Sequence, residues 1–255
     1  MLNQMNDNET TYDRFRAHVL DRAFPCLGAK SALRRDHAHS VELGRLGNPG
    51  NTLPLADALE AYIDVLDARV NPPEAFHTFV AHYEPQEMDE LAFEQGLWSE
   101  LQSLHEYDAQ HHPWAPHVSS DPQDPSFAYS FAQVAFFVVG LHPASSRLAR
   151  QFERPTLVFN FHDQFERLRQ ASHWERMQGA IRARDVALQG FPNPELADHG
   201  AASQVRQYSG RLHQPGWRAP FERVPSHDHT SDNARPPSGC PFSSTHGAEL
   251  SRSHS

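Results

Sequence analysis

The sequence predicts an α+β fold in which a small mixed β-sheet is flanked by amphipathic helices in a single domain. Some segments repeat apolar residues at helical spacing, while others are short, aromatic and β-branched and lie between Pro or Asp residues. The two kinds follow one another without a regular βα repeat, which favours α+β over a doubly wound sheet. At 255 residues the chain is long enough for one domain with a large core.

Apolar periodicity predicts the individual elements in order. The predicted helices cover residues 11–22, 55–70, 88–105, 161–170 and 174–188. The predicted strands cover residues 76–83, 127–141 and 156–160. The second of these is long enough for two strands or one bent strand, and turn residues at 190–194 close the last helical region.

The two ends of the chain differ in composition from the part between them. Residues 1–10 carry no apolar period, and residues 222–255 contain eight serines and four histidines with almost no large apolar side chain. The few apolar side chains of these two segments cannot bury enough surface to offset the conformational entropy that ordering the chain would cost. Both ends are therefore predicted to be disordered. The folded domain is therefore expected to span residues 11–221, and a chain ending at Glu222 should fold as the full chain does.

Charge and hydropathy argue against several classes of partner. The net charge of −10 disfavours nucleic acid and anionic membranes. The longest apolar run, residues 134–141, is far shorter than the roughly 20 residues that span a bilayer, and the start lacks the features of a signal peptide. No Walker loop, GxGxxG after a strand or GxSxG elbow is present. We therefore expect a cytoplasmic protein without nucleic-acid or membrane partners.

The first candidate site is the segment Phe-Pro-Cys-Leu-Gly-Ala-Lys at residues 24–30. Pro25 favours a turn or a first helical turn, which places Cys26 at a helix N-terminus, where amides and the helix dipole lower the pKa of a thiol. Such a thiolate could ligate iron, and Gly28 would let the backbone approach a flat macrocycle. The spacing is similar to that of the cysteine loop of thiolate-haem monooxygenases. The alternative is a buried cysteine that acts as a small hydrophobe.

The second candidate lies where the apolar run 134–141 ends in His142 and is followed by Arg147 and Arg150. The two arginines could hold a substrate carboxylate or haem propionates through charge-assisted hydrogen bonds, or they could be solvated helix charges. His142 could be an axial ligand or a proton relay, although a histidine before proline is often a turn residue.

The third candidate is the pair His162 and Glu166, four residues apart on a predicted helix. The pair could bind a divalent metal, Glu166 could receive a guanidinium, or both could be surface residues. A set of nearby histidines has no recognised order of metal ligands and is read as part of a loop. This set contains His105, His111, His112 and His117.

Taken together, several phrases occur in an order that resembles the YqcI/YcgG family, in particular its haem-dependent guanidine N-hydroxylases of the guanitoxin type. Besides residues 24–30, the phrases are residues 140–150, 155–160, 164–169 and 206–211. The resemblance runs from about residue 24 to residue 221.

The resemblance implies a protein that binds haem b and uses dioxygen and an electron donor to hydroxylate a nitrogen of a small guanidine or amine, such as arginine or a derivative. On this interpretation Cys26 binds the haem iron, and Gly28, Lys30, Arg147 and Arg150 bind the cofactor. The catalytic residues would be Glu166, His142 and His162, with Glu166 receiving the guanidinium. A homodimer is compatible with this hypothesis of a haem-dependent N-hydroxylase.

The chain departs from the family pattern near residue 219. Where that pattern has Cys-Pro-Phe two residues after a tryptophan, this chain has Trp-Arg-Ala-Pro-Phe at residues 217–221, and a Cys-Pro-Phe recurs at 240–242. Cys240 is therefore the alternative iron ligand, and Cys26 is preferred because it lies in the predicted folded part. Ala219 also motivates a second hypothesis, a non-catalytic haem-binding or stress-related protein of the same fold. A third hypothesis is a non-haem metal protein that uses His142, His162 and Glu166.

Overall fold

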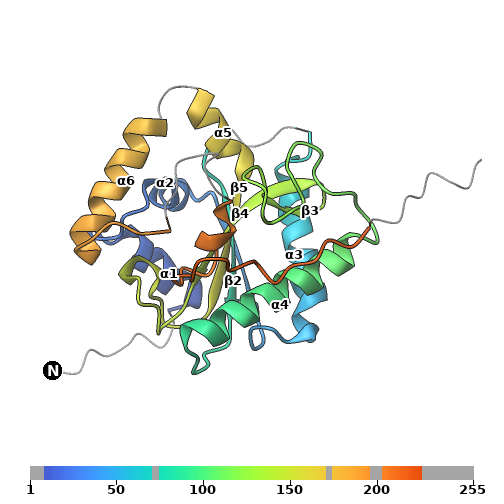
Figure 1. Cartoon of the computed structure of the whole chain (residues 1–255), viewed down its shortest axis with the longest axis horizontal. Coiled ribbons are helices and arrows are strands. Elements are labelled where there is room, and N and C mark those ends of the chain that lie inside the picture. The colour runs from blue at the N-terminus through green and yellow to red at the C-terminus, as the bar shows by residue number, and fades with distance from the viewer. Residues whose placement is uncertain (1–8, 71–74, 171–173, 196–202, 226–255) are drawn as a thin grey trace, which may run out of the picture.

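A computed structural model describes residues 9–70, 75–170, 174–195 and 203–225. Figure 1 shows the strands between α1, α2 and α6 on the left and α3 and α4 on the right. The predicted α+β class is confirmed. The predicted disorder of residues 1–8 and of residues 226–255, with Cys240 among them, lies outside the described residues.

The sheet has five strands in the order β1-β2-β5-β4-β3. The parallel pair is β1 with β2, and the other neighbouring pairs are antiparallel, so the sheet is mixed as predicted. The strands are β1 (Ala38–Leu43), β2 (Thr78–Tyr83), β3 (Tyr129–Phe131), β4 (Val134–Leu141) and β5 (Thr156–Phe161). The predicted strand 127–141 is thus two strands joined by a tight turn.

Six α-helices occur in the described part of the chain. They are α1 (Thr11–Leu20), α2 (Leu27–Arg34), α3 (Thr52–Val65), α4 (Glu90–Asp108), α5 (His162–Gln170) and α6 (Trp174–Gln189). Side chains cap several of them: Thr10 and Asp13 form a capping box on α1, and Asp89 accepts a hydrogen bond from the Ala92 amide of α4 at 2.7 Å. No helix of the described residues is long and apolar enough to cross a membrane.

Alternation along the central strands gives the sheet two apolar faces. On β4, Phe136 and Val138 face the larger core under α3 and α4, whereas Val139 and Leu141 face α1 and α2. The side chains of β5 alternate between the same two faces. Because both faces of β4 are covered, its side chains are apolar on both sides, and its sequence is a continuous apolar run.

The sequence prediction omitted β1, an edge strand. Its alternation places His39, Val41 and Leu43 on one side, with Gly44 after them, and this short period-two pattern is the signal that could have identified it. The strand is only partly buried and carries polar residues, which kept it out of a search for apolar segments.

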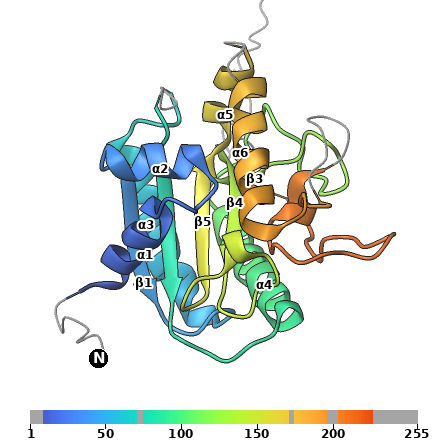
Figure 2. The same ribbon diagram turned by 90° about the vertical axis from the view of Figure 1, so that its left-hand side faces the viewer.

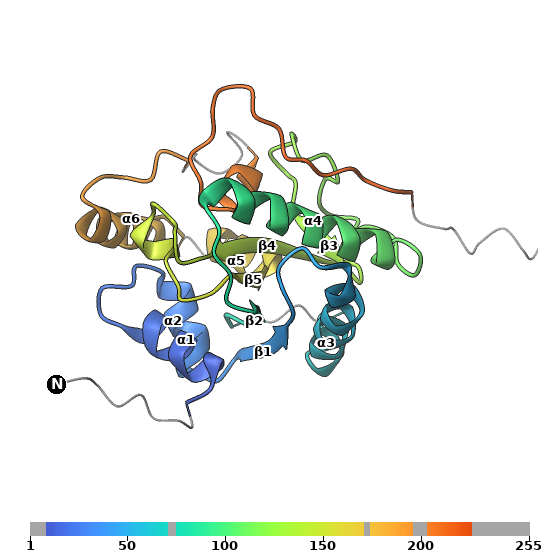
Figure 3. The same ribbon diagram turned by 90° about the horizontal axis from the view of Figure 1, so that it is seen from below.

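Residues 203–225 run along α4, as Figures 1 and 3 show. Gln102 of α4 exchanges two hydrogen bonds with the backbone of Glu222, and the Val224 amide donates to His105 Nε2 at 3.0 Å. The aromatic side chains of Trp217 and Phe221 pack against Trp98. The last described segment is thus part of the core on the α4 side.

Candidate functional site

A pocket of about 270 Å³ lies on the sheet face covered by α1, α2, α5 and α6. Figure 2 shows α1 and α2 on one side of β5 and α5 and α6 on the other. Strands β4 and β5 contribute Phe137, Val139, Leu141 and Val158, and the helices contribute apolar side chains such as Phe15. The volume is near the lower end of ligand pockets, and the largely apolar lining is typical of them.

Cys26 is part of the pocket lining and caps the N-terminus of α2. Its Sγ accepts a hydrogen bond from the Ala29 amide at 3.5 Å. The helix N-terminus therefore exists where the sequence predicted it, but the expected effect on acidity is wrong. Burial raises the pKa of the thiol, and it outweighs the amides of Ala29 and Gly28 and the positive charge of Arg150, which act in the opposite direction.

Three arginines line the same pocket: Arg150, Arg169 and Arg182. Arg150 is fixed by hydrogen bonds from Nη1 to the Gly140 carbonyl at 3.1 Å and from Nη2 to the Gln207 carbonyl at 3.0 Å. Burial lowers the pKa of Arg150 to about 10, so its guanidinium stays charged at neutral pH. Together with Cys26, these residues give an apolar pocket a positively charged wall.

The structure places Arg147 beside the pocket and not in its lining. Its buried guanidinium donates to Asp185 at 2.5 Å and stacks over the ring of Phe191. Asp185 itself does line the pocket and is the acidic side chain among the described lining residues. Arg147 thus holds a pocket carboxylate in place, a role different from the predicted contact with an anionic ligand.

Gly28 and Lys30 also lie outside the lining of this pocket. A side chain at Gly28 would meet the ring of Phe76 at 3.1 Å, so the glycine allows a close approach to that ring. The Lys30 ammonium is buried and donates to the carbonyls of Asp21 at 2.6 Å and Arg22 at 3.3 Å. Both residues fix α2 against its neighbours.

His142 lies on the opposite side of the sheet from Cys26. It follows β4 directly and stacks on Phe93 of α4 with ring centroids 4.3 Å apart. Burial lowers its pKa to about 4, so it is neutral at physiological pH. The predicted metal set of His142, His162 and Glu166 is therefore not assembled, because the sheet separates His142 from the other two residues.

His162 and Glu166 do lie together at the start of α5, with His162 Nε2 3.4 Å from Glu166 Oε1. His162 lines the pocket, whereas Glu166 does not and forms an ion pair with Arg169 one turn further along. The predicted guanidinium site at Glu166 thus already holds an arginine of its own helix.

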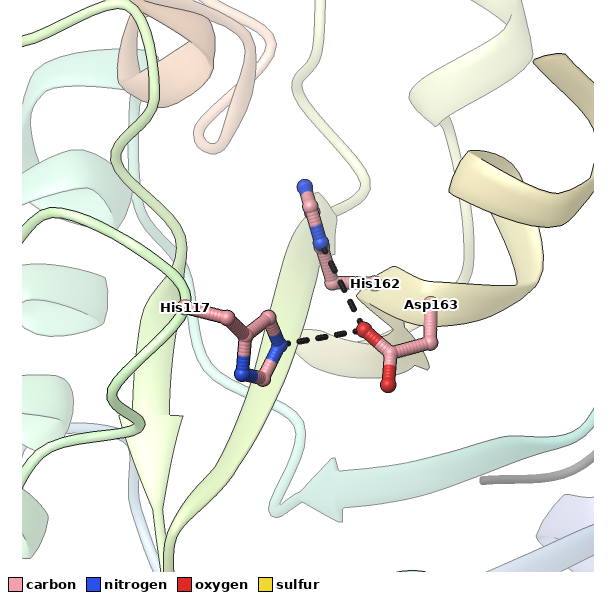
Figure 4. A group of neighbouring side chains, drawn as sticks. All are labelled: His117, His162 and Asp163. Carbon is pink, nitrogen blue, oxygen red and sulfur yellow. Dashed lines mark hydrogen bonds and ion pairs between the residues drawn. The ribbon is translucent and has the colours of Figure 1, made fainter. Parts of the chain in front are cut away.

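Tertiary structure adds two groups that the sequence did not predict for this site. Figure 4 shows His117, from the loop between α4 and β3, beside His162 and Asp163. Of the four histidines interpreted as a loop cluster, His117 is the one that joins this group.

Helix α6 contributes a stripe of lining residues spaced three or four apart, which helical periodicity could have identified. These residues are Gln178, Ile181, Arg182 and Asp185.

Residue 219, where the expected family pattern has a cysteine, lies away from this pocket in the fold. Ala219 is not a lining residue and packs against the core cluster that contains Trp98 and Phe221, on the α4 side. A cysteine at residue 219 would lie on that side of the sheet, and Cys26 lies on the other.

The fold and the site define an α+β protein that brings one cysteine thiol and several guanidinium groups into one apolar pocket. The chain belongs to the YqcI/YcgG family, whose family model matches residues 15–222. The match covers all five strands, and the predicted resemblance, from about residue 24 to residue 221, lies wholly within it. Comparisons with curated proteins and with solved structures found no match.

Proposed function

We propose that this protein is a haem-dependent N-oxygenase that hydroxylates a nitrogen of a small guanidine or amine, with Cys26 as the ligand of the haem iron. The observation that carries the proposal is the position of Cys26 in the lining of an apolar pocket that also holds Arg150, Arg169 and Arg182. A thiol, aromatic walls and cationic groups suit an apolar macrocycle with two propionates. At about 270 Å³ the pocket is smaller than a haem, so the proposal requires α5 and α6 to move away from α1 and α2 when haem binds.

The acidity of Cys26 is compatible with this role. Burial keeps the thiol protonated at neutral pH when no metal is bound. Coordination to a metal ion deprotonates a thiol outright, and the nearby charge of Arg150 favours the resulting thiolate. The raised pKa therefore describes a thiol that stays protonated at neutral pH and that a bound metal ion would deprotonate.

Haem, when bound, supplies the activation of dioxygen, with electrons from an external donor. The protein supplies the environment. Phe137, Val139 and Val158 exclude water from the pocket, and the arginines hold propionates or a substrate carboxylate. Asp185 is the carboxylate among the described lining residues, and Arg147 contacts its Oδ2 alone, which leaves Oδ1 for a guanidinium, whereas Glu166 lies outside the lining.

The absorption spectrum of the ferrous carbonyl complex tests this proposal in the full chain, with Cys26→Ser and its matched control Cys240→Ser. We expect the strongly red-shifted Soret band of a thiolate-bound haem in the unsubstituted chain and in Cys240→Ser, and its loss in Cys26→Ser. The reverse pattern would assign the iron to Cys240. Absence of any Soret band after reconstitution with haem would exclude the haem proposal.

The same spectrum, followed during titration with free arginine, tests the substrate class. Asp185→Asn should weaken binding by roughly 1.5 to 3 kcal/mol, the scale of hydrogen bonds to charged groups, while Glu166→Gln should not. The double variant Arg147→Met, Asp185→Asn controls for the buried charge that Asp185→Asn leaves unpaired. A normal haem spectrum without any arginine-dependent oxygen consumption would favour the non-catalytic haem-binding protein.

A further inference from the structure

Two histidines and an aspartate meet where α5 begins (Figure 4), and one of them, His162, also lines the pocket. His117 Nε2 lies 3.1 Å from Asp163 Oδ1, and His162 Nδ1 lies 3.9 Å from the same oxygen. One potential ligand atom of each residue lies within 4.8 Å of the others. The three residues come from chain segments about 45 positions apart, so the fold and not local sequence brings them together.

The backbone on each side of this group is fixed by hydrogen bonds. The loop that carries His117 is held by the Ala115 amide, which donates to Ser130 Oγ at 2.9 Å, and by the Ser119 amide, which donates to the Ser126 carbonyl at 3.1 Å. His162 directly follows the buried strand β5. The backbone that carries His117 and His162 is therefore already held in position and does not have to rearrange for the three side chains to meet.

The surroundings of His162 point to a ligand at Nδ1. This nitrogen is buried and has no hydrogen-bond partner within the described residues. The other ring nitrogen, Nε2, faces Glu166 Oε1 at 3.4 Å. Metal-binding histidines usually donate the hydrogen of their second nitrogen to a carboxylate, which fixes the tautomer and leaves the first nitrogen as a donor to the metal. The side chain of His162 is 13% exposed and that of His117 is 45% exposed, so an ion could enter from the His117 side.

We propose that His117, His162 and Asp163 bind one divalent transition-metal ion of the class that imidazole and carboxylate ligands prefer, zinc or ferrous iron. Bonds of about 2.1 Å in tetrahedral geometry separate ligand atoms by about 3.4 Å, and the separations of 3.1 and 3.9 Å in this group lie on either side of that value. Three protein ligands leave at least one position open for water or another small ligand. Because His162 also lines the pocket, that position lies next to it.

This site does not depend on haem binding at Cys26, and the two proposals can fail separately. Isothermal titration of the chelator-treated full chain with zinc, followed by zinc X-ray absorption, tests the metal site without using the Soret band. We expect one site whose spectrum contains two imidazole ligands. His117→Ala and Asp163→Asn should each weaken zinc binding at this site by at least 100-fold, and Glu166→Gln by about 10- to 100-fold, the range found for such outer carboxylates.

His111→Ala is the matched control, because His111 is an exposed histidine of the preceding turn that lies outside the group. It should bind zinc as the unsubstituted chain does, and the four histidines of residues 226–255 are the same in every variant. Equal zinc affinity and an unchanged absorption spectrum in both His117→Ala and Asp163→Asn would overturn the proposal and assign the zinc to other histidines. Circular dichroism confirms that each variant is folded.

Discussion

Glu100 of α4 is a buried carboxyl group that the apolar pattern of its helix does not reveal. It accepts hydrogen bonds from the Gly47 amide at 3.0 Å and from Asn51 Nδ2 at 3.4 Å. Burial nevertheless dominates and raises its pKa to about 7, compared with 4.5 for an ordinary glutamate. The native protein therefore keeps this proton at pH values where the unfolded chain has lost it.

This difference predicts a pH-dependent loss of stability. A raised native pKa contributes stability that is fully present below about pH 4.5 and is lost as the pH rises through about 7. Glu100→Gln keeps an acceptor oxygen for Gly47 and removes the ionisation. Urea unfolding at pH 4.5 and 8 should show the variant gaining up to a few kcal/mol relative to the unsubstituted chain at the higher pH. A difference that does not change with pH would contradict the assigned pKa.

At the scale of elements, the hairpin between β3 and β4 turns at two non-glycine residues with positive φ. Ala132 has φ 48° and Gln133 has φ 64°. Two-residue hairpin turns require such angles and usually use Asn-Gly or Asp-Gly. Here the backbone of Ala132 is held instead by Asp108, which accepts from its amide at 2.9 Å, and by Arg69, which donates to its carbonyl at 3.0 Å.

Two substitutions at the exposed Gln133 should therefore differ in their effect on stability. Gln133→Gly relieves the left-handed strain and should leave stability unchanged or raise it by up to about 1 kcal/mol. Gln133→Val places a β-branched residue at positive φ and should lower it by roughly 1 to 2 kcal/mol. Thermal unfolding of both variants measures the difference. A valine variant as stable as the glycine variant would show that the turn relaxes without cost.

At the scale of the whole molecule, the last described segment is fixed to α4 through Glu94. This buried carboxylate binds Ser209 Oγ at 3.1 Å, the Arg211 guanidinium at 2.6 and 3.0 Å, and the imidazole of His213. Burial alone would raise the pKa of Glu94, but hydrogen bonds from His213 and Arg211 outweigh it, and the pKa is lowered. The family match ends at residue 222, so this contact lies within the matched part of the chain.

Removing the charge of Glu94 should release residues 203–225 from α4. Glu94→Gln removes the carboxylate that pairs with Arg211 and accepts from the His213 ring, while Glu195 remains 3.6 Å from His213 Nδ1. Breaking a buried ion pair typically costs about 3 to 5 kcal/mol. Gln102→Ala, at the exposed end of the same contact, should cost less than about 1 kcal/mol. Urea unfolding measures the cost, and limited proteolysis should cleave residues 203–225 faster in Glu94→Gln. Similar behaviour of the two variants would show that aromatic packing alone holds the segment.

The sequence by itself determined the elements whose apolar period is strong. The helices over α1, α3 and α4 and the strands β2, β4 and β5 follow from local spacing, because a side chain's place in a period of 3.6 or 2 decides which face it occupies. The helix N-terminus at Cys26 also follows from local sequence, since Pro25 and the residues after it are its direct neighbours. The phrase order was enough to assign the family.

Only the tertiary structure decided which side chains share a site. His142 and His162 each follow a strand of the sheet, yet the sheet separates them, because their strands are antiparallel neighbours and the two side chains project to opposite faces. His117 joins His162 and Asp163 through a loop whose path no local pattern encodes. The acidity of Cys26 was likewise decided by burial, a long-range property that outweighs the local helix terminus.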